Sequence, residues 1–82
     1  MGKYEKLLQS ILSGRSDANI ELDELRRLLT RLGFEERIRG SHHIFRKPGI
    51  VDRPNLQDSG GKAKPYQVKQ VREIIVKYKL SE

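Results

Sequence analysis

The sequence has no cysteine and only two histidines among its 82 residues. Without cysteine it can form no disulfide, no thiolate nucleophile and no cysteine-ligated zinc site. It also has no run near the roughly 18 consecutive apolar residues that a membrane span requires, and no apolar N-terminal stretch with a small-residue cleavage site. We therefore expect a cytoplasmic protein in which the histidines are the only side chains that ordinarily titrate near neutral pH.

The length of the chain limits the size of its core. A chain this short buries only about 60% of its unfolded-state surface, which leaves room for a single domain over residues 1–82. Apolar residues make up 35% of the sequence and charged residues 34%, so the core must come from a few well-patterned segments.

The net charge of +6 is concentrated in two windows of the sequence. Residues 37–47 carry +4 and residues 60–79 carry +5, whereas the rest of the chain sums to −3. Positive charge gathered in two segments indicates a surface that faces a polyanion. The alternative at this point is a solvated lysine face with no partner.

Apolar side chains recur at helical spacing in three segments, residues 3–13, 22–32 and 65–78. Asp23 is the expected N-cap of the second helix, and Gly33 is its expected stop. The third helix should begin at a proline, because proline suits the first helical turn. Its outward face is expected to carry the cations Lys69, Arg72 and Lys77.

After Gly33 the apolar period changes from that of a helix to that of a strand. Residues 34–38 and 42–46 predict a hairpin with a turn at Gly40, and Pro48-Gly49 fits the middle of a type II turn. A third strand is expected over residues 51–57. Because Pro54 cannot donate a ladder hydrogen bond, this strand should be short, bulged or at the sheet edge.

These elements predict an α+β domain of order α-α-β-β-β-α, with a three-stranded antiparallel sheet and helices covering one face. The sequence does not decide which face of residues 42–46 is buried, because alternation gives each face one apolar and at least one basic member. A bulge near Gly40 would be one way to resolve this conflict.

Several catalytic motifs are missing. Gly60-Gly61-Lys62 lacks the spacing of a phosphate-binding P-loop. His42 and His43 are adjacent, so on a strand they point to opposite faces and cannot chelate one ion together. Ser41 beside His42 has no acidic residue nearby to complete a triad. We therefore expect no metal and no cofactor.

His42 is the remaining candidate for chemistry. It follows a glycine turn at the start of a strand, where a side chain is held by the sheet and still reached by solvent. A surface histidine in a hairpin is ordinary, and on the pattern alone that simpler reading is favoured. The basic windows on both sides favour a catalytic role, because phosphodiester chemistry needs a proton-transfer group and cations for the phosphate.

Three pieces of the sequence together resemble one family. They are Leu32-Gly33-Phe34, the run Gly40-Ser41-His42-His43-Ile44-Phe45, and the approach Gly60-Gly61-Lys62-Ala63-Lys64-Pro65 to the last helix. In this order and spacing they look like the HicA toxins of bacterial type II toxin-antitoxin systems. The resemblance covers residues 20–79 and leaves residues 1–14 as an N-terminal helical extension.

The resemblance implies a double-stranded-RNA-binding-domain-like fold that acts as an mRNA endoribonuclease and is silenced by a HicB-type antitoxin. The family's essential histidine maps to His42. The cations expected to hold RNA phosphates are Arg39, Arg46, Lys62, Lys64 and Lys69. Many members carry a second histidine at the end of the third strand, where this chain has Gln57.

A second proton-transfer group is therefore left open among Lys62, Lys64, Tyr66 and water. The sequence also leaves open a non-catalytic RNA-binding module, since the same basic surface would bind RNA by shape and phosphate contacts. A protein-interaction adaptor without a nucleic-acid partner is the third class, and the placement of the charge argues against it.

Overall fold

The computed structural model describes residues 2–81. It has three helices and three strands in the predicted order, with a short 3-10 turn η1 (Asp17–Asn19) after the first helix. The helices are α1 (Lys3–Ser13), α2 (Leu22–Arg31) and α3 (Pro65–Lys77), and the strands are β1 (Glu35–Arg39), β2 (His42–Arg46) and β3 (Asn55–Gln57). The predicted α+β class and element order are confirmed.

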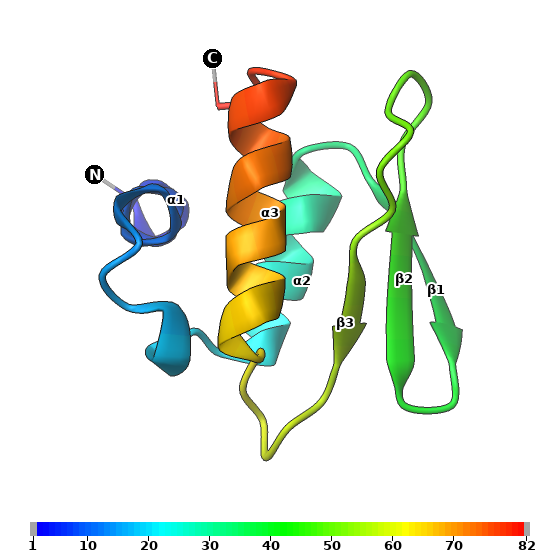
Figure 1. The fold of residues 1–82 in the computed structure, drawn as a ribbon, viewed down its shortest axis with the longest axis horizontal. Helices are drawn as coiled ribbons and strands as arrows, with labels where there is room; N and C mark the ends of the chain where they lie inside the picture. Colours follow the sequence, from blue (N-terminus) through cyan, green and yellow to red (C-terminus); the bar gives the residue numbers. More distant parts are fainter. Residues whose placement is uncertain (1, 82) are drawn as a thin grey trace.

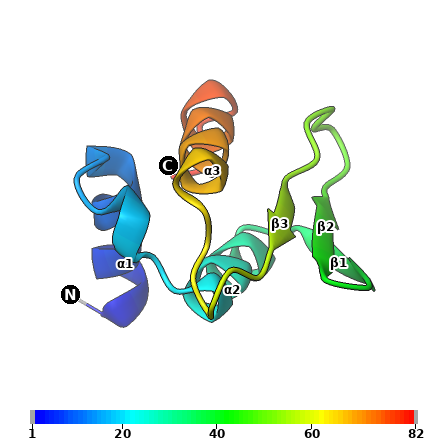
Figure 2. The same ribbon diagram turned by 60° about the horizontal axis from the view of Figure 1, so that its bottom comes forward.

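The elements form three layers (Figures 1 and 2). The antiparallel sheet has the order β1-β2-β3, and α2 and α3 lie against one of its faces. α1 packs against these two helices on the side away from the sheet. The prediction of a sheet covered by helices on one face is confirmed, and no helix within residues 2–81 covers the opposite face.

Burial of Phe45 decides which face of β2 turns inward. Phe45 is fully buried against the helices, together with Leu56 of β3. Because side chains alternate along a strand, His43 shares this covered face, and His42, Ile44 and Arg46 share the open one. The register is regular from Arg39 opposite His42 onward, so the bulge considered near Gly40 is absent.

The start of α2 differs from the prediction. The helix begins at Leu22 with Glu21 as its N-cap, so Asp23 lies within the first turn and does not cap it. Glu21 pairs with Lys62 in an isolated bridge, and the Leu22 N–H donates to the Gly61 carbonyl (3.0 Å). This pairing holds the backbone extended up to Glu21, so the helix starts directly after it.

The end of α2 is as predicted. Gly33 has φ +99°, the left-handed conformation that glycine adopts without strain. The Phe34 N–H reaches the Leu29 carbonyl (3.0 Å) and the Gly33 N–H reaches that of Thr30 (3.0 Å), which is a Schellman motif. Phe34 and Leu29 are both buried, so the motif also directs the chain from the helix into the sheet.

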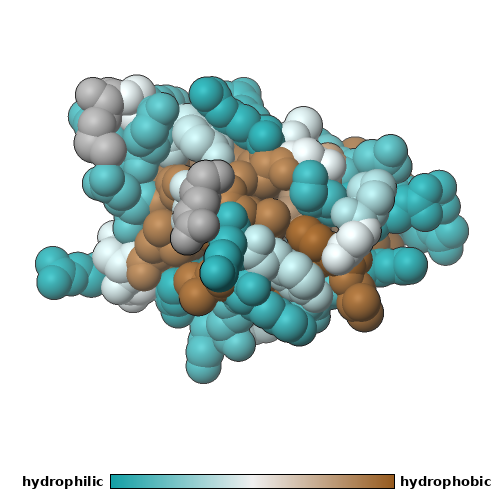
Figure 3. Space-filling model, turned by 90° about the horizontal axis from the view of Figure 1, so that it is seen from above, coloured by the Kyte–Doolittle hydropathy of each residue, from teal (hydrophilic) through white to brown (hydrophobic). Residues whose placement is uncertain are grey.

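The third strand is short and lies at the sheet edge, as expected from the presence of Pro54. It begins at Asn55, however, and not at residue 51 as predicted. The type II turn forms, with Gly49 at φ +86°. The residues after it leave the sheet, because Asp52 accepts a hydrogen bond from the Tyr78 hydroxyl (2.9 Å) at the end of α3. Val51 is 87% exposed there, and Figure 3 shows apolar surface among polar side chains at this end.

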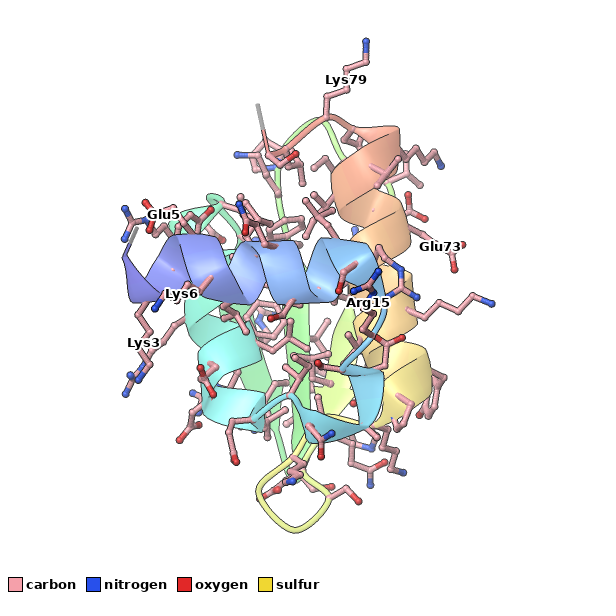
Figure 4. The ribbon with its side chains drawn as sticks, turned by 90° about the vertical axis from the view of Figure 1, so that its left-hand side faces the viewer. Lys3, Glu5, Lys6, Arg15, Glu73 and Lys79 are labelled. Carbon is pink, nitrogen blue, oxygen red and sulfur yellow. The ribbon has the colours of Figure 1, made fainter. Side chains whose placement is uncertain are left out.

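α1 is fixed to the rest of the protein by Arg72, which was expected to face outward. Its Nη1 donates to the Ile11 carbonyl (3.1 Å) and to Asp17 Oδ1 (2.9 Å). Ile11 itself is fully buried. Figure 4 shows α1 lying across α2 and α3, so the extension covers the helical layer on the side away from the sheet.

Replacing Arg72 with alanine should lower the free energy of unfolding by about 2 kcal/mol, because the half-buried guanidinium donates charge-assisted hydrogen bonds to two acceptors. Hydrogen exchange of the α1 amides should accelerate in this variant. Lys69→Ala, an exposed cation on the same helix, is the control and should change stability by less than about 0.5 kcal/mol. Equal effects in both variants would contradict an anchoring role.

Candidate functional site

The open face of the sheet is rich in arginine. Arg37 and Arg39 on β1 lie opposite Ile44 and His42 on β2, and all four share this face with Arg46. Arg53, in the loop before β3, joins them around a surface hollow whose lining includes Glu35, Arg37, Arg39, Ile44, Arg46 and Arg53. A concentration of four guanidinium groups on an uncovered sheet face is suited to binding several phosphates.

His42 lies on this face at the hairpin end of β2 and is exposed. Arg39 is directly opposite on β1 and Gln57 directly opposite on β3. The ring Nδ1 is 3.1 Å from the side-chain oxygen Oδ1 of Asn55, which is two residues before Gln57 on the same strand. His42 is thus flanked by a cation on one side and by two amides on the other.

The start of α3 brings a further cation to the edge of this face. Lys64 Nζ donates to Gln57 Oε1 (3.4 Å), and Gln57 Nε2 donates to Ser41 Oγ (3.5 Å). The Lys64 backbone is fixed because its N–H donates to Gln67 Oε1 (3.2 Å), and Gln67 is buried. Lys64 is therefore the ammonium group that the hydrogen bonds link to the strand position opposite His42.

The structure brings together some of the predicted cations and separates others. Arg39 and Arg46 lie on the face of His42, and Lys64 lies at its edge. Lys62 is exposed in the loop before α3, where its backbone pairs with Ser59 and Glu21. Lys69 is exposed on α3, in the helical layer on the other side of the sheet from His42.

Three residues of the site were missed by the sequence reasoning. Strand alternation places Arg37 with Arg39, and this signal was available in the sequence. Arg53 lies in the irregular loop before β3, and Asn55 directly follows this loop, whose path the sequence pattern does not determine. Their positions beside Arg46 and His42 come from the pairing of β2 with β3.

His43 has a different environment on the covered face. Glu36 Oε2 accepts hydrogen bonds from Arg26 Nε (2.6 Å) and from His43 Nδ1 (2.8 Å). The hydrogen bond from Arg26 is the main cause that lowers the pKa of Glu36, and it outweighs the burial that opposes it. The same interaction raises the pKa of Arg26. His43 therefore joins β2 to β1 and α2 through Glu36 and has a structural role.

The lowered pKa of Glu36 makes stability depend on pH. Its contribution is fully present above the ordinary carboxyl pKa of 4.5 and is lost as the pH falls through the lower pKa of the folded state. Glu36→Gln should cost about 1–2 kcal/mol at pH 7. Below pH 4 it should lose less further stability than the parent does.

Thermal denaturation at a series of pH values measures this difference. Glu73→Gln, on the exposed face of α3, is the control and should follow the parent at every pH. Parallel curves for the parent and Glu36→Gln would show that Glu36 does not carry the acid dependence.

Across residues 2–81, no three histidine, aspartate or glutamate side chains are grouped so that they could ligate a metal ion. Within the same residues, no helix has the length and apolar character needed to cross a membrane.

The fold and this site define a small basic α+β domain that presents one exposed histidine on an uncovered, arginine-rich sheet face. The chain belongs to the HicA family, described as the HicA toxin of bacterial toxin-antitoxin systems, whose model matches residues 22–76. The matched range runs from α2 almost to the end of α3, and α1 lies before it. No curated protein and no solved structure matches the chain at a significant level.

Proposed function

We propose that this chain is a metal-independent endoribonuclease that cleaves mRNA as the toxin of a type II toxin-antitoxin system. The observation that carries the proposal is the position of His42, exposed on the uncovered sheet face with Arg39 opposite it and Lys64 bonded to Gln57 on its other side. Membership of the HicA family supports it, because the family resemblance implies this activity.

The proposed reaction is transesterification within the RNA. The 2′-oxygen forms a bond to the adjacent phosphorus while the bond from phosphorus to the 5′-oxygen of the next nucleotide breaks. His42 accepts the proton of the 2′-hydroxyl, and the departing 5′-oxygen takes a proton from water or from Lys64. The products are a 2′,3′-cyclic phosphate and a free 5′-hydroxyl. The substrate supplies its own nucleophile, so the step needs no metal-activated water.

Cations are needed because negative charge increases on the phosphate in the transition state. Arg39 lies directly opposite His42, and Lys64 is the candidate for the other side of the phosphate. Among the groups left open by the sequence, Lys64 is favoured over Lys62 and Tyr66, because only Lys64 is hydrogen-bonded to the residue paired with His42.

The site should have little preference for RNA sequence. The open-face positions of the three strands are occupied by charged, amide, histidine and isoleucine side chains, and Tyr66 is exposed on α3 instead. Recognition of single-stranded RNA by base usually uses aromatic platforms on which the bases stack. Phosphate contacts from arginine carry no sequence information.

The proposal is tested by incubating the purified protein with mRNA in buffer that contains EDTA. Cleavage that yields 2′,3′-cyclic phosphate ends is expected. Cleavage that requires added Mg²⁺, or that leaves 5′-phosphate ends, would contradict the mechanism.

A non-catalytic RNA-binding module is the second candidate. The observation that favours it is Gln57, an amide that cannot transfer protons at the strand position opposite His42. Binding of RNA without any cleavage, in both EDTA and Mg²⁺, would support this module and exclude the nuclease.

The proposed partner is a HicB-type antitoxin encoded by a neighbouring gene. To silence the site it must cover His42 and offset the charge of the arginines, so an acidic surface or an inserted side chain is expected. Growth arrest on expression of this chain should be relieved by co-expression of the neighbour. Arrest that persists despite the neighbour would contradict the pairing.

A further inference from the structure

The hydrogen bond between His42 and Asn55 defines how the histidine ring is held. We propose that Asn55 is a positioning residue that keeps neutral His42 in the tautomer with the proton on Nδ1, so that Nε2 is the nitrogen that accepts a proton from RNA. The part that concerns RNA rests on the proposed function, whereas the tautomer is a property of the protein alone.

The chemistry of the two partners sets the direction of the bond. Nδ1 of His42 lies 3.1 Å from Oδ1 of Asn55. An amide oxygen carries no proton and can only accept, so the ring nitrogen must be the donor. A neutral imidazole has one proton, and fixing it on Nδ1 leaves a lone pair on Nε2. Nε2 of the exposed His42 ring is then the proton acceptor available on the open face.

The backbone on both sides holds this contact in place. Asn55 stands between Pro54 and Leu56, which are both buried, and the Pro54 carbonyl accepts a hydrogen bond from the Phe45 N–H (2.9 Å). His42 is paired with β1 on one side and β3 on the other. Both side chains are exposed, but neither backbone can move without breaking the sheet or the core, so the amide stays within reach of the ring.

The neighbouring histidine shows why an amide suits this role. His43 Nδ1 instead faces the carboxylate of Glu36 (2.8 Å). In general, a carboxylate beside an imidazole stabilises the protonated form of the ring. A protonated imidazole cannot accept a further proton and cannot act as a base. Asn55 fixes the orientation of His42 without adding a negative charge, so the ring remains available to accept the proton.

Nitrogen-15 NMR of the histidine rings measures the tautomer directly. In the full chain above pH 8, His42 is expected to show a protonated Nδ1 and an unprotonated Nε2. In Asn55→Ala the signals should shift toward the form with the proton on Nε2, which is the form that an isolated histidine side chain prefers. The His43 ring, held by Glu36, is the internal reference and should not change.

Gln57→Ala is the matched control for this measurement. It removes the amide that is paired with His42 but forms its hydrogen bonds with Ser41 and Lys64 and not with the ring. The His42 tautomer should be the same in Gln57→Ala as in the parent. A tautomer that changes equally in both variants, or in neither, would overturn the assignment to Asn55.

Kinetics test the catalytic consequence separately. Asn55→Ala should lower kcat for RNA cleavage by about 10-fold with little change in KM, because a misoriented base affects the chemical step more than binding. Asn55→Asp keeps an acceptor at the same place and should preserve the tautomer. Its pH-rate profile should move to higher pH, since a carboxylate stabilises the protonated ring.

The two proposals fail in different ways. A His42 tautomer that depends on Asn55 in a protein that cleaves no RNA would leave the positioning role intact and reject the nuclease. Cleavage that requires His42 but proceeds at the parental rate in Asn55→Ala, with an unchanged tautomer, would reject the positioning role and leave the nuclease intact.

Discussion

His42→Ala should cleave RNA about 10²–10⁴-fold more slowly than the parent and bind RNA with nearly the same affinity. The reason is that alanine removes the proposed proton acceptor of the reaction but leaves the arginines that are proposed to hold the phosphates. Single-turnover cleavage with enzyme in excess gives the rate of the chemical step, and fluorescence anisotropy of a labelled RNA gives the affinity.

The loss in this variant should be chemical and not structural. His42 is exposed, and its only side-chain hydrogen bond among those the structure describes runs to another exposed residue, Asn55. Thermal unfolding of His42→Ala should therefore stay close to that of the parent. A His42→Ala protein that is folded and cleaves RNA at the parental rate would refute the catalytic assignment.

His43→Ala is the matched control, because the two histidines are adjacent and face opposite sides of one strand. His43 Nδ1 is 2.8 Å from Glu36 Oε2 on the covered face, so removing the ring should lower the free energy of unfolding by about 1–2 kcal/mol. The cleavage rate per folded molecule should be unchanged. The two variants together separate a loss of chemistry from a loss of stability.

The helices and the hairpin were predictable because their apolar periods are strong and local. Each helix carries an apolar stripe, and Gly33 and Pro65 mark a helix end and a helix start by their own backbone preferences. The predicted N-cap of α2, Asp23, was wrong because the start of this helix is not determined locally. Its position is set by the pairing of Glu21 with Lys62, which are 41 residues apart in the sequence and leave no local signal.

The orientation of β2 could not be read from its own residues. Alternation groups Ile44 with His42 and Arg46, and Phe45 with His43 and Lys47, so both faces mix apolar and basic side chains. The structure buries Phe45, the larger apolar side chain. His43 can accompany it because Glu36 and Arg26 supply a hydrogen-bonded ion pair on the covered face. This compensation involves three separate elements and is visible only after folding.

Long-range partners account for the other differences. Arg72 lies on a helix position that reads as an outward cation, but its acceptors Asp17 and Ile11 belong to an extension at the other end of the chain. Lys69, which the sequence also predicted to bind RNA, is exposed on α3 and therefore belongs to the helical layer. The structure places the predicted cations on two different layers, and the charge pattern does not reveal which layer each one occupies, because that depends on how α3 packs.

The open-face arginines should carry most of the RNA affinity. Replacing Arg37, Arg39, Arg46 and Arg53 together with glutamine removes four cations from one surface and leaves the buried core untouched. For single-stranded RNA each lost phosphate contact reduces the slope of log affinity against log salt by about 0.7, so four contacts account for a slope of about 2.8. When the salt concentration rises fourfold, these four contacts would therefore account for a loss of RNA affinity of about 50-fold in the parent, and the variant should lack this part of the salt dependence.

A second quadruple variant separates the position of the charge from its amount. Lys3, Lys6, Arg15 and Lys79 are exposed and lie around α1 and the end of α3, away from the sheet (Figure 4). Replacing them with glutamine lowers the net charge from +6 to +2, as the open-face variant also does. If general attraction between a basic protein and RNA governs binding, both variants should lose affinity equally.

The open-face assignment instead requires the two variants to differ. Affinity and salt slope, measured by anisotropy at several salt concentrations, should fall sharply in the open-face variant and only slightly in the α1 variant. The remaining affinity of the open-face variant should come mainly from Lys64, which the substitutions leave in place at the edge of the site. Equal salt slopes in both variants would place the RNA elsewhere and would remove the reason for assigning the phosphate to the face of His42.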